Sequence, residues 1–114
     1  MGQYFKIVNL DKREYLDPHK LGMGLKLYEI CANRGSGVLP FLLRKSDETG
    51  GGDIHKDYRY AGRWAGDRIV VIGDYDSSKL YDQLDSYTDI SNEVRREFED
   101  FIEEKLDPPW GSKE

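Results

Sequence analysis

Apolar residues dominate the start of the chain, interrupted by Lys6 and Asn9. Residues 4–10 are rich in aromatic and β-branched side chains, which favour a strand with two different faces. Residues 9–12 supply Asn and Asp, whose side chains favour turns, and a second short strand is predicted at 14–16. Pro18 ends that strand, because proline cannot continue a central strand. The opening pattern therefore predicts a β-hairpin.

Two apolar segments follow the hairpin. Residues 25–32 have helical spacing and are apolar most of the way round, which predicts a well-buried helix. Residues 38–45, VLPFLLRK, predict a second helix with proline in its first turn and basic residues in its last. A buried strand is the alternative for this second segment.

The C-terminal third begins with an ambiguous segment at 79–88, whose leucines have helical spacing. Residues 92–105 then predict an amphipathic helix, because Val94, Phe98 and Phe101 recur at a helical interval. Asp89 or Ser91 is the expected N-cap.

The strongest strand signal is RIVVIGDY, which begins at Arg68. Its four successive aliphatic residues predict burial on both faces, and hence a central place in the sheet. Together these elements predict an α+β fold, with a small, mainly antiparallel sheet that contains the N-terminal hairpin and the central strand 68–74. Helices are expected to pack on one face. We expect a single domain at 1–107 and a flexible tail at 108–114, where Trp110 could fold back onto the core.

Composition narrows the class of protein. The chain has 114 residues and one cysteine, Cys31, so no disulfide can form within it. A reducing, cytoplasmic setting is expected. No signal-like segment or apolar run of about 20 residues is present, and we expect no association with a membrane.

Charge is distributed unevenly. Residues 1–75 contain 12 basic and 10 acidic residues, whereas residues 76–114 contain 5 basic and 12 acidic residues. The isoelectric point near 5.1 argues against non-specific nucleic-acid binding, which normally needs a broad basic surface. A local site for a small anionic ligand is compatible with this distribution.

Residues 50–68, GGGDIHKDYRYAGRWAGDR, form the main candidate for a binding site. Gly51 and Gly52 would let backbone N–H groups approach an anionic or nucleotide-like ligand. The cations Lys20, Arg63 and Arg68 would pair with its charge, and Trp64 would stack on a flat group. Neither GxGxxG nor GxxxxGK[ST] occurs. A loop whose aromatic residues pack locally is the alternative.

Metal and acid–base chemistry have a small set of candidates. Asp17 and His19 repeat the Asp-x-His pattern of Asp53 and His55, and the set His19, His55 and Asp53 would suit a zinc, manganese or iron site if the two segments met. The same three residues are the catalytic candidates, because histidine titrates near neutral pH and a carboxylate can orient it. The sequence assigns no reaction and no cofactor, and exposed histidines without a role are the alternative.

A second interpretation of function rests on the acidic face of the segment 92–105. That face could bind a basic protein partner, as in a non-catalytic interaction or regulatory protein of the kind associated with phages. The simpler reading is a solvated surface.

Three strings, GQYFKIVNLDKREYLDPHKLGMGLKL, GGGD and GRWAGDRIVVIGDY, resemble the motifs of a family of small proteins found in bacteria, phages, archaea and fungi. That family has no established activity, so the resemblance implies no reaction. It covers residues 2–28 and 50–75 and departs at Asp17, where histidine is common, and at RKSDETG. The resemblance implies that its motif positions include Pro18, His19, Lys20, Gly22, Gly24, Gly51, Gly52, Asp53, Gly62, Arg63, Trp64, Gly66, Asp67, Arg68, Gly73 and Asp74.

Overall fold

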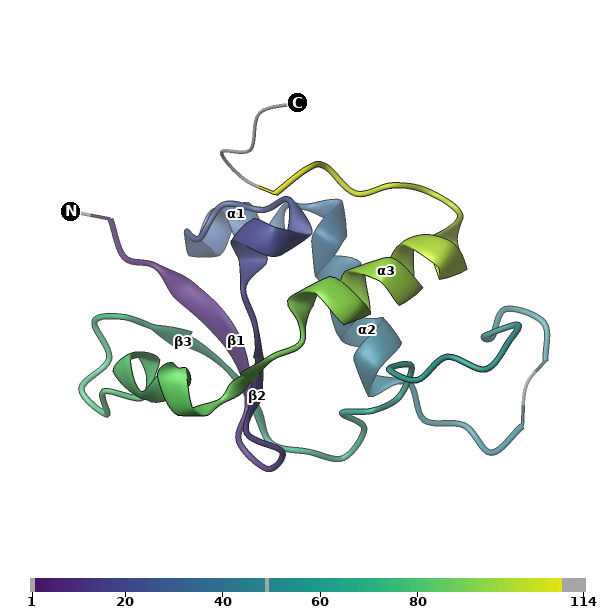
Figure 1. Ribbon diagram of the computed structural model, residues 1–114, viewed down its shortest axis with the longest axis horizontal. Helices are drawn as coiled ribbons and strands as arrows, with labels where there is room; N and C mark the ends of the chain where they lie inside the picture. The colour runs from purple at the N-terminus through teal and green to yellow at the C-terminus, as the bar shows by residue number, and fades with distance from the viewer. Residues whose placement is uncertain (1, 49, 110–114) are drawn as a thin grey trace.

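The computed structural model describes residues 2–48 and 50–109, which form a four-stranded sheet and several short helices (Figure 1). The strands are β1 (Phe5–Asn9), β2 (Glu14–Leu16), β3 (Ile69–Gly73) and β4 (Thr88–Asp89), in the spatial order β3-β1-β2-β4. β1 pairs antiparallel with both β2 and β3, while β4 runs parallel to β2. The predicted α+β class and the hairpin are confirmed, with a mixed sheet.

The helices are α1 (Leu27–Cys31), α2 (Val38–Leu43) and α3 (Ser91–Ile102), with 3₁₀ turns η1 (Pro18–Leu21), η2 (Arg34–Gly37) and η3 (Tyr81–Ser86). The helix predicted at 38–45 is confirmed as α2, so the alternative of a strand there is wrong. The helix ends at Leu43, however, so the basic residues Arg44 and Lys45 lie beyond its last turn. The ambiguous segment at 79–88 contains the 3₁₀ helix η3. No helix among residues 2–48 and 50–109 is long and apolar enough to span a membrane.

Two apolar clusters cover opposite faces of the sheet. The larger one joins Ile7 and Leu16 of the sheet to Phe41 of α2 and Phe98 of α3. In the smaller one, Leu84 of η3 packs with sheet residues on the other face. The expectation that helices pack on one face therefore holds for α2 and α3 but not for η3.

β3 is an edge strand, and the prediction of a central position is wrong. It pairs with β1 alone, and Val71 keeps 37% of its surface exposed. Its aliphatic run arises because Ile69 packs against the larger cluster while Val70 and Ile72 belong to the smaller one. A strand is apolar when both faces of the sheet are covered at its position. Coverage of the faces does not decide whether the strand lies at the edge or the centre of the sheet, because strands pair side by side within the sheet.

α1 also differs from its prediction. Only Ile30 of this five-residue helix is buried, whereas Tyr28 is 81% exposed and Leu27 and Cys31 are exposed as well. A helix this short contacts the core through one side chain, so its apolar outer positions face solvent.

α3 confirms the predicted amphipathic helix, but its N-cap and its last residue differ from the prediction. The N-cap position is Ile90, and the Asp89 carboxylate accepts a hydrogen bond from the Ser91 N–H at 2.9 Å. The helix stops at Ile102 because Glu103 adopts a left-handed conformation (φ 56°). Residues 110–114 lie outside the described residues, and with them the expectations for Trp110 and for most of the tail.

Candidate functional site

The segment 62–68, GRWAGDR, lies against the N-terminal hairpin. Arg63 donates from Nε (3.1 Å) and Nη2 (2.5 Å) to the Glu14 carboxylate, and the Trp64 indole N–H donates to the same carboxylate at 2.9 Å. Trp64 is fully buried and Glu14 is 6% exposed. The protein itself covers the Trp64 rings, and the expected stacking of Trp64 on a ligand stays a prediction.

The electrostatics of Glu14 follow from these contacts. Burial raises the pKa of Glu14, but the hydrogen bonds from Arg63 and Trp64 and the charge of Arg63 outweigh burial and lower it below its ordinary value. The Arg63 guanidinium is correspondingly held charged, because its hydrogen bonds to Glu14 raise its pKa. The pair fixes the loop to strand β2.

The end of the segment makes a second set of contacts with the hairpin turn. Asp67 Oδ2 accepts hydrogen bonds from Asn9 Nδ2 at 2.8 Å and from Lys12 Nζ at 2.6 Å. Arg68 donates from Nε to Asp11 Oδ1 at 2.9 Å, and its backbone N–H donates to Asp11 Oδ2 at 2.8 Å. Arg63 and Arg68, both expected to meet a ligand anion, thus already have carboxylate partners.

The side chains of Lys20, His19 and His55 have different surroundings. Lys20 Nζ contacts Asp89 Oδ2 at 2.6 Å, and this hydrogen bond raises the pKa of Lys20. His19 borders an open hollow beside Tyr4 and Lys26, whereas His55 stacks on Phe101 of α3 at a centroid distance of 5.6 Å.

The fold does not bring the metal and catalytic candidates His19, His55 and Asp53 together in one metal-binding group. Among residues 2–48 and 50–109, no group of three or more His, Cys, Asp or Glu side chains is placed to hold a metal ion. Asp17 instead accepts the backbone N–H of His19 at 3.1 Å, which caps η1. Acid–base roles for His19, His55 and Asp53 stay predictions.

Residues 52–54 of the glycine-rich loop (50–68) line a small, half-open apolar pocket against α2 and α3. Its volume is about 180 Å³. The lining consists of Gly37, Pro40, Phe41, Arg44, Gly52, Asp53, Ile54, Phe98 and Phe101. Two charged side chains belong to this lining, and they form a bidentate pair: Arg44 Nε to Asp53 Oδ1 at 2.9 Å and Arg44 Nη2 to Asp53 Oδ2 at 2.6 Å.

Acidic residues of α3 hold the adjoining part of the loop. Glu97 accepts hydrogen bonds from the backbone N–H groups of Tyr60 at 2.8 Å and Arg59 at 3.1 Å. Asp100 accepts from the Tyr58 hydroxyl at 2.5 Å and from Lys56 Nζ at 2.7 Å. Burial, followed by the hydrogen bond to Asp100, raises the pKa of Tyr58 to about 12. These acidic side chains therefore have a role inside the molecule.

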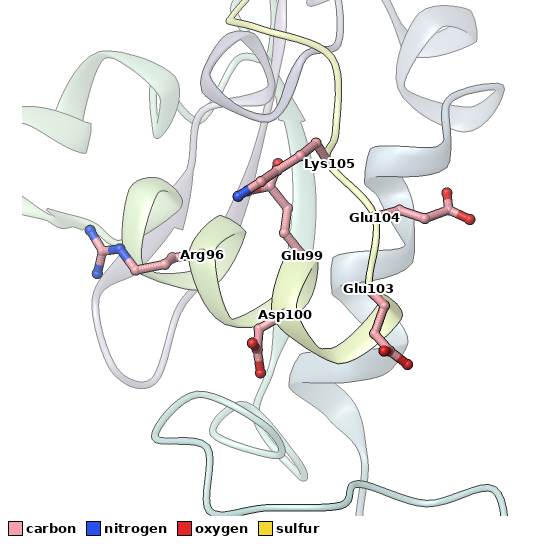
Figure 2. Close-up of a pocket in the computed structure, with 6 residues that line it drawn as sticks. All are labelled: Arg96, Glu99, Asp100, Glu103, Glu104 and Lys105. Carbon is pink, nitrogen blue, oxygen red and sulfur yellow. The ribbon is translucent and has the colours of Figure 1, made fainter.

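The end of α3 has a second, open hollow of about 440 Å³ with a charged lining. Figure 2 shows that its labelled side chains point in different directions, with Asp100, Glu103 and Glu104 directed apart. Glu99 accepts from Arg95 and from the Leu106 N–H, and Glu104 pairs with Arg34. These carboxylates do not converge on one point. The hollow is therefore a weaker candidate for a ligand site than the apolar pocket is.

The residues predicted for a binding site overlap only in part with the lining of this pocket. Gly52 and Asp53 were expected in the site and do line the pocket, whereas the pocket's cation, Arg44, was interpreted only as a helix-terminal residue. Arg44 follows an apolar helix directly, and this was the only local signal that it stands beside apolar surface.

The chain matches no known family model, no curated protein and no solved structure. The roles of its residues therefore follow from the contacts described above.

Proposed function

We propose that the protein is a small-ligand-binding domain whose ligand occupies the apolar pocket beneath the glycine-rich loop. The observation that carries this proposal is the pocket's lining, which combines Phe41, Phe98 and Phe101 with one charged pair. Ligand sites in proteins are typically concave and apolar, with a few polar groups that fix orientation.

The size of the pocket indicates the size of the ligand. Its volume of about 180 Å³ is close to that of an engineered cavity of about 150 Å³ that binds benzene. A single ring fits this space, whereas a whole nucleotide is larger than it. We therefore narrow the expected ligand to a small molecule with one flat ring.

The aromatic side chains provide a suitable surface for such a ring. The rings of Phe41 and Phe98 meet edge to face at a centroid distance of 5.9 Å, and those of Phe41 and Phe101 are tilted by 40° at 5.6 Å. Aromatic groups favour edge-to-face and offset contacts, so a ligand ring can extend this cluster.

The loop that borders the pocket can adjust to an incoming ligand. Gly52 has φ 85°, a left-handed conformation that glycine adopts without strain, and a Cβ at Gly50, Gly51 or Gly52 would meet nothing within 4 Å. Loose packing at these three positions allows them to move without disturbing the core.

The test is a titration of the ¹⁵N-labelled protein with benzyl alcohol, a neutral single-ring probe. We expect saturable shifts in the amide signals of Gly52, Ile54 and Phe41. Ile54→Trp places a ring in the pocket and should abolish the response. Tyr28→Ala, which alters an 81% exposed side chain on α1, should leave it unchanged. An unsaturable response, or equal binding by Ile54→Trp, would contradict the proposal.

A further inference from the structure

The ion pair between Arg44 and Asp53 connects the end of a helix to the glycine-rich loop. Arg44 directly follows α2, which packs in the larger core cluster, whereas Asp53 follows the three glycines of the loop. Both side chains are partly exposed, at 25% for Arg44 and 18% for Asp53. The Asp53 side chain can therefore move into solvent more easily than the Arg44 side chain can move away from the pocket.

The contacts of the loop differ along its length. Residues 56–60 are held by Glu97 and Asp100 of α3. Among the described contacts of residues 50–53, the link to another element is the pair with Arg44, and a further bond, Asp53 N–H to Gly50 O at 3.1 Å, lies inside the turn. Breaking the Arg44 pair would thus release residues 50–53 and leave 56–60 in place.

The chemistry of the pair matches that of a ligand. A guanidinium binds a carboxylate through two parallel hydrogen bonds, and Asp53 uses this geometry. The hydrogen bonds from Arg44 and from the Ile54 N–H lower the pKa of Asp53, so it is ionised at neutral pH. Exchange of one carboxylate for another on Arg44 leaves no charge unpaired inside the molecule.

We propose that Asp53 occupies the position of a ligand carboxylate, and that the ligand is a small aromatic carboxylate which displaces Asp53 from Arg44 and releases residues 50–53. This inference rests on the proposed function, because the ring of the ligand occupies the same apolar pocket. In the free protein the Asp53 side chain competes with the ligand and keeps the loop closed over the pocket.

The experiment compares benzoate with benzyl alcohol in NMR titrations at constant ionic strength. Asp53→Asn removes the competing charge and should tighten benzoate binding by about tenfold or more, the value of a hydrogen bond to a charged group. Binding of benzyl alcohol should not change. Arg44→Gln should remove the preference for benzoate and retain benzyl alcohol binding. Asp11→Asn, which removes the carboxylate of the exposed Arg68 pair outside the pocket, is the matched control.

Release of the loop has its own readout. Benzoate, but not benzyl alcohol, should speed hydrogen exchange at the Ile54 N–H, because this group donates to Asp53 Oδ1 at 2.7 Å in the free protein.

The outcomes separate the two proposals. If benzyl alcohol binds but Asp53→Asn leaves benzoate affinity unchanged, this inference is wrong and the proposed function stands. Equal tightening by Asp11→Asn would assign the effect to overall charge and would also overturn the inference. If neither probe binds the wild type or Asp53→Asn, the proposed function fails, and this inference fails with it.

Discussion

Replacement of Glu14 by alanine tests the contact between the loop and the hairpin. Glu14 is 6% exposed and accepts hydrogen bonds from Arg63 and from the fully buried Trp64. The variant leaves the indole N–H without its acceptor, which costs about 1–3 kcal/mol. It also removes the partner of Arg63, and breaking a buried ion pair costs about 3–5 kcal/mol.

The expected total lies at the lower end of these ranges. The Arg63 side chain keeps 32% exposure, so water can replace part of what the carboxylate provides. We expect the free energy of unfolding to fall by about 3 kcal/mol. For a urea m-value of about 1–3 kcal/mol/M, the unfolding midpoint should fall by about 1 M or more.

Urea unfolding followed by circular dichroism measures this change, with Asp11→Ala as the control. Asp11 also pairs with an arginine of the same segment, but the Arg68 side chain is 73% exposed. Water screens exposed ion pairs, so the control should lose much less stability than Glu14→Ala. If Glu14→Ala lost no more than the control, the buried contact would not stabilise the fold in the way described here.

Two further predictions concern the glycines and acid stability. Gly62 has φ 77°, and an added Cβ would lie 2.7 Å from the Arg44 carbonyl oxygen, so Gly62→Ala should lose about 2 kcal/mol or more in urea unfolding. Gly51→Ala has open space and should change stability by less than about 0.5 kcal/mol, so equal losses would refute the distinction. Glu14 has a lower pKa in the folded state than in the unfolded chain, so its contribution is complete above the unfolded value of about 4.3 and is lost as pH falls through the folded value. Stability of Glu14→Gln measured from pH 7 to pH 3 should therefore lack part of the acid loss of the wild type, and parallel pH curves would contradict this assignment.

The local elements could be predicted because their signals are local. The aromatic and β-branched residues at 4–10 and the turn residues after them predict the hairpin, and the helical spacing of Val94 and Phe98 predicts α3. In each case the period of the side chains matches the geometry of the backbone over a few residues. These features follow from neighbouring positions and need no knowledge of distant ones.

The candidate site was predicted only in part for the opposite reason. Gly52 and Asp53 were predicted site residues and line the pocket, whereas Arg63 and Trp64 contact Glu14, and Arg44 was not among the predicted residues. The sequence does not show which of the many carboxylates a given arginine or lysine will pair with. The choice between structural pairing and ligand binding depends on which carboxylate the fold brings close.

The sequence by itself determined the α+β class, the hairpin, the amphipathic helix and the position of the glycine-rich loop, since each depends on residues near one another in the chain. Tertiary structure alone decided that β3 lies at the sheet edge, that Trp64 is buried on Glu14, and that Arg44 and Asp53 meet beside three phenylalanines. The physical reason is that pairing energies depend on distance in space and on exposure to water, and for residues such as Arg63 and Glu14, 49 positions apart, both are set only when the chain folds.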